Sequence, residues 1–288
     1  MSASNDHIRP PYATRTWVVA GRTRGGPVKQ AGFTLTEIAV VLLIVGLLLG
    51  GMLYTYSAQV DQSNRLETQR RLESAKDLLI AYAIVNGRLP CPASTSGSTP
   101  SHSGDTSTAC TEPFTGFLPG STIGFQPVDA SGFALDSWNN RLRYAISQTI
   151  VSGTVPHFTN STNLKSNGVS TQPNDLVICV SSTGTTPLSV PSPSCGTSIS
   201  VTNQKTLAAI VLSPGKNGAS LTTGRADENI NNKQIGPPAN ANHALFVYRP
   251  YAGIKSDIES RLEEFDDQMV WIPAGQLYAR LISAGILP

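Results

Sequence analysis

The sequence predicts an α+β protein in which one long N-terminal helix, partly transmembrane, packs on a small antiparallel β-sheet domain with long loops. Three observations lead to this class. A run without any charged side chain extends from Ile38 to Val60, and helical spacing of apolar residues continues beyond it. Short apolar segments separated by turn residues then fill the second half of the chain. Segments of this kind predict strands, which form a sheet that a helix covers on one face.

The first helix is predicted to extend from about Phe33 to Asn86. About 20 apolar residues, each rising 1.5 Å, cross the hydrocarbon core of a bilayer, so Ile38 to Tyr56 is a candidate membrane span. Residues 61–86 contain no Pro or Gly, and apolar side chains recur there at helical spacing, at Leu72, Ala75, Leu79 and Tyr82. Gly87 suits a left-handed cap and ends the predicted helix.

Three glycines, Gly46, Gly50 and Gly51, interrupt the apolar run. Each weakens a helix by about 1 kcal/mol relative to alanine, which would allow local unwinding at this point. Glycines also allow the backbones of neighbouring membrane helices to approach closely. The sequence leaves both interpretations open.

The rest of the chain contains strand candidates separated by turn-rich linkers. These candidates are Arg141–Ser147, Leu176–Val180, Leu207–Leu212, Ala244–Tyr248 and Gln268–Ile272. A last helix is expected over about residues 274–284, because Leu277, Leu281 and Ala284 share one face and Gly285 follows. The predicted sheet is antiparallel and packs on the apolar stripe of the long helix.

The four cysteines, Cys91, Cys110, Cys179 and Cys195, form an even set in a part of the chain expected outside the cytoplasm, where disulfides persist. We favour pairing Cys91 with Cys110 and Cys179 with Cys195, since each pair brackets a segment rich in Ser, Thr, Gly and Pro. Each closed loop of about 15 to 20 residues would contribute about 3 kcal/mol. A zinc site is the alternative, but the chain has no C-x-x-C spacing, and only His102 lies between the first two cysteines.

The formal charge of +2 is unevenly distributed. Residues 1–32 carry five basic side chains against Asp6, a balance of +4, which leaves −2 for residues 33–288. A basic flank before an apolar span stays in the cytoplasm and directs the remainder across the membrane. The near-neutral remainder has no nucleic-acid-binding footprint in its bulk charge, so no nucleic-acid partner is predicted.

A single carboxylate, Glu37, stands at the head of the apolar run. A charge in the bilayer costs a few kcal/mol unless it has a partner. An ammonium group on a neighbouring molecule would be a suitable partner, because a buried carboxylate is tolerated when paired and strongly unfavourable when alone.

The segment Gly32-Phe33-Thr34-Leu35-Thr36-Glu37 with the apolar run behind it resembles the N-terminal signature of type IV pilins and of the pseudopilins of type II secretion. The resemblance implies that a prepilin peptidase cuts between Gly32 and Phe33 and that the new amine of Phe33 is methylated. It also implies that Glu37 meets the Phe33 amine of a neighbouring subunit when the helices bundle into a filament.

The resemblance implies a division of the chain into four parts: a cleaved basic leader (1–32), a transmembrane half-helix (33–56), a periplasmic amphipathic half-helix (57–90) and a globular pilin-like head (91–288). The expected function is that of a structural subunit of a type IV pilus-like filament or type II secretion pseudopilus. Expected partners are other subunits through the helix, the prepilin peptidase, an inner-membrane assembly platform, and lipid before assembly. The protein would begin in the inner membrane with its head in the periplasm, then join a periplasmic or extracellular filament.

Other functions remain open from the sequence. A minor pilin at a filament tip, acting in adhesion or DNA uptake, shares the architecture. A cleaved signal peptide or a plain anchor, with cleavage after Ala58 in the first case, would instead give a periplasmic binding protein or a hydrolase tethered by one helix. An enzyme is not expected, because the chain has no G-x-S-x-G motif and no local pattern around its histidines.

Two further segments are similar to parts of major pseudopilins. Asp136-Ser137-Trp138-Asn139 through Tyr144 is similar to an Asp-x-Trp-Gly-x-x-x-x-Tyr turn, with Asn139 in place of Gly, and predicts Trp138 and Tyr144 in the core with Asp136 capping the turn. The segment from Ser213 to Gly218 followed by Asp227, Glu228 and Asn229 looks like a calcium-binding loop, with calcium as the only cofactor suggested. A plain turn is the competing interpretation.

Six acidic residues lie within eleven positions near the C-terminus: Asp257, Glu259, Glu263, Glu264, Asp266 and Asp267. A charge run of this kind predicts a solvated face. The alternative is a patch that binds a partner or a metal.

Overall fold

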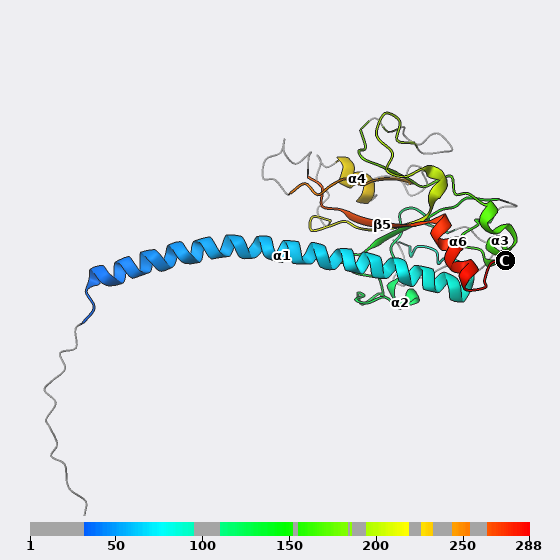
Figure 1. Cartoon of the computed structure of the whole chain (residues 1–288). Coiled ribbons are helices and arrows are strands. Elements are labelled where there is room, and N and C mark those ends of the chain that lie inside the picture. Colours follow the sequence, from blue (N-terminus) through cyan, green and yellow to red (C-terminus); the bar gives the residue numbers. More distant parts are fainter. Residues whose placement is uncertain are drawn as a thin grey trace, which may run out of the picture. The chain divides into compact units, whose positions relative to one another are not determined.

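The structure is a computed structural model that describes residues 32–94, 110–151, 155–183, 185, 194–218, 226–232, 244–253 and 264–288 (Figure 1). The chain divides into two compact units, Met1–Thr55 and Tyr56–Pro288. The predicted leader lies outside the described residues up to position 31, as do His102 and most of the first disulfide loop.

Helix α1 extends over Leu35–Asn86, 52 residues. It continues through Gly46 and Gly50, so the structure contains an intact helix where the sequence also allowed local unwinding. The helix ends where the sequence predicts, because Gly87 adopts a φ of 67°, which favours glycine.

Over the described residues, the strands of the second unit form two sheets. Strands β1 (Arg143–Ile146), β3 (Leu207–Ser213) and β5 (Gln268–Pro273) form an antiparallel sheet in the order β1-β3-β5. Strands β2 (Val177–Cys179) and β4 (Leu245–Val247) form a separate parallel pair. The α+β class with an antiparallel sheet is confirmed, but placing all five strands in one antiparallel sheet was wrong. Both strands of the pair are buried along their whole length, as is usual for parallel strands, and such runs carry no signal of direction.

Short helices complete the second unit. They are α2 (Gly120–Ile123), α3 (Ser161–Asn167), α4 (Ala226–Asn232) and α6 (Ala274–Ser283), with 3-10 turns η1 (Gly168–Ser170) and η2 (Gln204–Thr206). Helix α6 follows β5 directly and carries the predicted Leu277 and Leu281 into the core. Within this unit, α4 lies on the side of the sheet away from α1 (Figure 1).

The main core of the second unit lies between the second half of α1 and the antiparallel sheet. The α1 side chains Leu72, Ala75, Leu79 and Ala83 have no exposed surface and share one hydrophobic cluster with Tyr144, Val211, Ile272 and Leu277. The cluster also contains Cys91 and Cys110. Burying each leucine contributes about 1.5 to 3 kcal/mol, so this stripe anchors the head domain to its helix.

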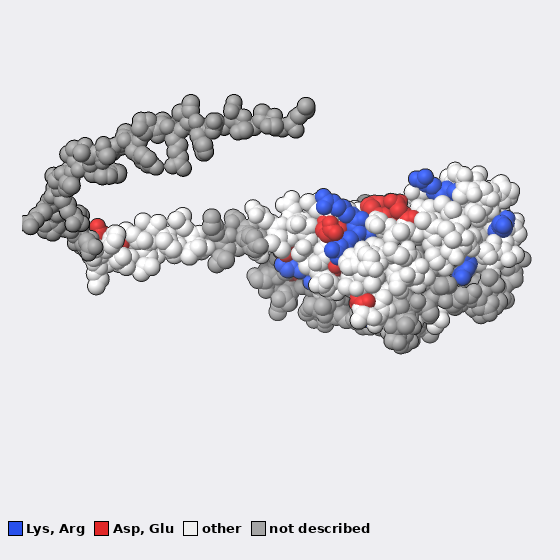
Figure 2. Space-filling model, turned by 90° about the horizontal axis from the view of Figure 1, so that it is seen from below, with Lys and Arg blue, Asp and Glu red and all other residues white. Residues whose placement is uncertain are grey.

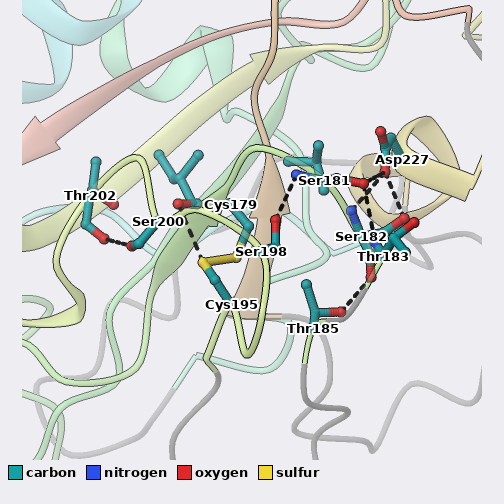
Figure 3. Close-up of a disulfide and its surroundings, with 12 residues drawn as sticks. Cys179, Ser181, Ser182, Thr183, Thr185, Cys195, Ser198, Ser200, Thr202 and Asp227 are labelled. Carbon is teal, nitrogen blue, oxygen red and sulfur yellow. Dashed lines mark hydrogen bonds between the residues drawn. A yellow bond between two sulfur atoms is a disulfide. The ribbon is translucent and has the colours of Figure 1, made fainter.

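Both favoured disulfides are present, Cys91–Cys110 and Cys179–Cys195. They close loops with sequence separations of 19 and 16 residues. The second bridge joins the end of β2 to the segment that carries Ser198 and Ser200 (Figure 3). Each bridge closes a segment whose sequence is rich in Ser, Thr, Gly and Pro.

Asp136 accepts most of the hydrogen bonds that hold the predicted turn together. It has no exposed surface, and its Oδ1 accepts hydrogen bonds from the backbone N–H groups of Trp138 and Asn140, each at 2.8 Å. Its Oδ2 accepts from Ser213 Oγ at 2.6 Å, and burial raises the pKa of its carboxyl group. Its backbone oxygen accepts from Arg71 of α1 at 2.7 Å. The turn is thereby tied to both β3 and α1.

The two aromatic side chains of this segment, Trp138 and Tyr144, differ in burial. Tyr144 is buried, with its hydroxyl donating to the backbone oxygen of Pro90 at 3.2 Å. Trp138 is only half-buried, so its placement in the core was wrong. It precedes Asn139, whose φ of 65° turns the chain at the surface.

A buried histidine, His157, is expected to make the stability of the second unit depend on pH. His157 has no exposed surface, and its Nε2 lies 3.2 Å from the hydroxyl of Tyr278, which donates to the backbone oxygen of Thr171 at 2.8 Å. Burial lowers the pKa of His157 to about 4. In the unfolded chain the pKa is about 6.5, so below that pH the unfolded state takes up a proton that the folded state does not.

We therefore expect the free energy of unfolding to fall as the pH decreases from about 6.5 to about 4. Urea unfolding followed by circular dichroism at several pH values measures this dependence. The His157→Gln variant should show a smaller decrease across the same window, because glutamine does not titrate. Equal decreases in the two proteins would show that other groups cause the dependence.

Candidate functional site

The N-terminal end of α1 brings Thr34 and Glu37 into reciprocal hydrogen bonding. The backbone N–H of Thr34 donates to Glu37 Oε2 at 2.9 Å, and the backbone N–H of Glu37 donates to Thr34 Oγ1 at 3.3 Å. The Thr34 hydroxyl also donates to Glu37 Oε2 at 3.0 Å. This is a capping box, in which each side chain satisfies a backbone donor of the first turn. In the single chain, Glu37 therefore caps its own helix.

The residues next to this cap are open to the surroundings. Phe33 is 83% exposed, and a Cβ atom added to Gly32 would meet nothing within 4 Å. The described fold therefore gives no steric reason for glycine at position 32. The peptide bond between Gly32 and Phe33 lies two residues before α1, in an exposed segment without regular secondary structure that another protein could reach.

The apolar side chains after the cap are exposed as well. Large aliphatic side chains at most positions from Ile38 to Leu49 are 42 to 71% exposed. Figure 2 shows this stretch of the helix as a surface without Lys, Arg, Asp or Glu, whereas charged side chains are present on the second unit. A continuous apolar surface of this kind indicates a region that is covered by lipid or by other protein chains.

Over the described residues, the structure contains no helix that is both long enough and apolar enough to cross a membrane. The predicted span includes residues 51–56, whose side chains lie outside the described residues.

The three acidic and amide residues suggested for calcium do not converge. Asp227 accepts hydrogen bonds from Ser182 N at 2.7 Å and from Ser182 Oγ at 2.6 Å, and its Oδ2 lies 3.0 Å from Arg249 Nε. Figure 3 shows Asp227 directed toward Ser181 and Ser182. Glu228 instead accepts from Asn217 Nδ2, and Asn229 lies half-buried in α4. Residues 219–225 of the suggested loop lie outside the described residues.

The acidic run near the C-terminus is not a solvated face where the structure describes it. Glu264, Asp266 and Asp267 are 1%, 4% and 7% exposed, so that prediction was wrong for these three residues. The remaining acids of the run, Asp257, Glu259 and Glu263, lie outside the described residues. Polar side chains from other elements cover the buried carboxylates, which a count of charges along the chain does not reveal.

Comparison with known proteins defines the class of this segment. Residues 28–53 match the prokaryotic N-terminal methylation motif, the sequence at which prepilin-type precursors are cleaved and methylated. No curated protein and no solved structure matches the chain. The motif places the chain in the type IV pilin-like superfamily, and a long helix on an antiparallel sheet is consistent with a pilin-like fold. Proteins of this superfamily are typically structural rather than enzymatic.

Proposed function

We propose that this protein is a structural subunit of a helical filament, either a type II secretion pseudopilus or a type IV pilus. The observation that carries the proposal is the placement of Glu37 at the head of an exposed, uncharged apolar helix within a methylation motif. The apolar segment has no packing partner among the described residues of its own unit. A helix of this kind is stable when lipid or other helices surround it.

In this proposal, cleavage after Gly32 releases a new amine on Phe33. Once methylated it remains an ammonium group, and it pairs with the Glu37 carboxylate of an adjacent subunit. A carboxylate has lone pairs for several donors, so Glu37 can accept from its own Thr34 N–H and from a neighbouring ammonium group together. The pairing selects one register between helices, because a shift of one turn would leave both charges unpaired in an apolar environment.

Before assembly, the segment from Ile38 to Tyr56 would hold the subunit in the inner membrane, with the basic leader in the cytoplasm and the head in the periplasm. During assembly, contacts of the apolar helix with lipid would be replaced by contacts with the helices of other subunits. An inner-membrane platform would bring the subunits together. Gly46 and Gly50 are consistent with this step. A Cβ atom added to either residue meets nothing within 4 Å, so the fold of the single chain does not require glycine there. Their small size would instead allow close approach of neighbouring helices.

Blocking the cleavage site tests the processing step. The Gly32→Val variant is expected to accumulate as the uncut precursor and to be absent from sheared filaments, because the peptidase would no longer accept the residue before the cut. Immunoblotting against wild type reports the difference in size. Gly50→Ala is the control and should be processed normally, since it changes a glycine outside the cleavage site. Normal trimming of the Gly32→Val protein would contradict the proposed site.

A minor subunit at a filament tip is the second candidate. The Ser- and Thr-rich segments closed by the two disulfides favour it, because such loops are suited to surface recognition. The turn around Asp136 favours a secretion pseudopilin. Deleting the gene and measuring protein secretion, twitching motility and DNA uptake in the same strain separates the two. Loss of secretion alone would support the pseudopilin, and loss of motility or DNA uptake would support the pilin.

A further inference from the structure

Helix α1 is packed into the second unit along only part of its length there. From Thr68 onward one face of the helix is buried, and Leu72 and Leu79 have no exposed surface. None of the side chains of residues 57–67 is buried, and Leu66, just before Thr68, is 56% exposed. Residues 57–67, about three helical turns, therefore lie outside the core of the unit, and we call them the arm.

A cavity separates the arm from the head. Its volume is about 640 Å³, and its walls come from α1 on one side and from the segments after β4 and around the start of β5 on the other. The α1 wall includes Asp61, Arg65 and Leu66, and the opposite wall includes Tyr251 and Met269. Protein interiors are close-packed, with few voids larger than a water molecule. A space of this size shows that the arm and the head are not packed together along this stretch.

Two polar side-chain contacts join the arm to the head among the described residues. Lys216 Nζ lies 2.7 Å from Asp61 Oδ2, and the guanidinium of Arg65 stacks on the ring of Tyr251, with Cζ 3.4 Å from the ring centroid. Both contacts are open to solvent, since the side chains of Lys216 and Asp61 are 43% and 34% exposed and Tyr251 is 46% exposed. Exposed ion pairs and cation–π contacts contribute much less to stability than buried leucines do.

The next turn of α1 is held more firmly. The backbone N–H of Ser137 donates to Thr68 Oγ1 at 3.2 Å, and Arg71 donates to the backbone oxygen of Asp136 at 2.7 Å. The buried stripe of the helix begins at the same turn. A change from loose to firm attachment therefore occurs at Thr68.

The arm can separate from the head without disturbing the core. Loss of the two polar contacts would uncover no buried side chain, because the arm has none. Segments with few buried apolar contacts open at low free-energy cost, whereas packed segments open only with much of the domain. A helix of about three turns without tertiary packing is also marginal in water, so the arm can bend or fray once it is free.

We propose that the arm pivots near Thr68 between a closed and an open state. In the closed state, which the structure contains, the Asp61–Lys216 ion pair and the Arg65–Tyr251 stack join it to the head. In the open state both contacts are broken, and the packed part of α1 is unchanged. In the filament proposed above, the arm would let each head change its tilt on the bundled helices. That consequence rests on the proposed function, whereas the arm itself does not.

Double electron–electron resonance on the full-length chain in detergent tests the arm directly. All four cysteines are in disulfides, so spin labels attach only to introduced cysteines. Ser63→Cys labels the arm and Ala279→Cys labels α6, both at exposed positions. The control pair keeps the label on α6 and moves the other to the packed part of α1, at the exposed position of Ala81→Cys. We expect the distance distribution of the arm pair to be at least about twice as broad as that of the control pair.

Salt and two substitutions identify the contacts that close the arm. Raising the salt concentration from about 0.05 M to about 1 M screens the Asp61–Lys216 pair and should broaden the arm distribution further. Lys216→Gln and Tyr251→Leu should each broaden it at low salt. Lys205→Gln is the matched control and should leave it unchanged, because Lys205 is an exposed lysine without an ion-pair partner in the described part of the chain.

Equally narrow distributions for the arm pair and the control pair at both salt concentrations would overturn the proposal, because the arm would then be held as firmly as the packed part of α1. A broad arm distribution that neither Lys216→Gln nor Tyr251→Leu changes would overturn the assignment of the two closing contacts. All of these measurements use single chains in detergent. A negative result would therefore leave the proposed filament function standing, and a failure of filament assembly would not produce it.

Discussion

The Glu37→Ala variant is expected to insert into the membrane and to be cleaved after Gly32, yet to be absent from assembled filaments. The apolar run that drives insertion is unchanged, whereas the carboxylate that would neutralise a neighbouring Phe33 amine is gone. An unpaired ammonium in the apolar interior of a bundle costs several kcal/mol per subunit, enough to exclude the variant. Cell fractionation measures insertion, and immunoblotting of sheared filaments measures incorporation.

The capping box provides controls that separate the two roles of Glu37. Glu37→Gln keeps an acceptor for the Thr34 N–H, as capping boxes use Glu or Gln, but loses the charge. Thr34→Ala keeps the charge but loses the cap, at a cost of about 0.5 to 2 kcal/mol. We expect Glu37→Gln to fail in assembly and Thr34→Ala to assemble. The reverse result would mean that Glu37 acts by starting the helix rather than by pairing with an amine.

The Asp136→Ala variant is expected to lose about 3 to 5 kcal/mol of unfolding free energy, the largest change that we predict for a single residue of the head. Three donors, Trp138 N, Asn140 N and Ser213 Oγ, would lose their acceptor in a buried site. Each buried donor left without a partner costs about 1 to 3 kcal/mol. Urea unfolding of the full-length chain in detergent, followed by circular dichroism, measures the loss.

Asp136→Asn is the matched control for this turn. Its side-chain oxygen can still accept from the two backbone N–H groups, and only the contact with Ser213 changes. We expect a loss of about 1 kcal/mol, the contribution of a single hydrogen bond. A similar large loss in both variants would indicate that the charge of Asp136, rather than its acceptor geometry, stabilises the turn.

Much of the fold was predictable because its signals are local. The extent of α1 follows from apolar spacing and from the absence of Pro and Gly between positions 61 and 86, and its end follows from Gly87. The positions of all five strands follow from short apolar runs between turns. The sequence did not predict how these strands are divided between sheets. Strands β2 and β4 are three residues long and fully buried, and such short apolar runs do not indicate whether two strands pair in parallel or antiparallel.

The candidate site was predictable in part for the same reason. Gly32, Phe33 and Glu37 lie within one short motif, and the Thr34-x-x-Glu37 spacing that forms the capping box is also visible in the sequence. The contact between Glu228 and Asp266 was not predictable, because the two residues are 38 positions apart and meet only through tertiary packing. A count of charges along the chain predicts that Asp266 and Asp267 are solvated. In the folded chain both are buried, because residues from distant segments pack over them.

Mass spectrometry of the N-terminal peptide of the native protein tests whether the precursor is cut between Gly32 and Phe33. Processing at this bond gives a mature chain that begins at Phe33 and carries a methyl group on its amine. A chain that begins at Met1, or one cut after Ala58, would contradict processing at Gly32 and would indicate a tethered or secreted protein instead.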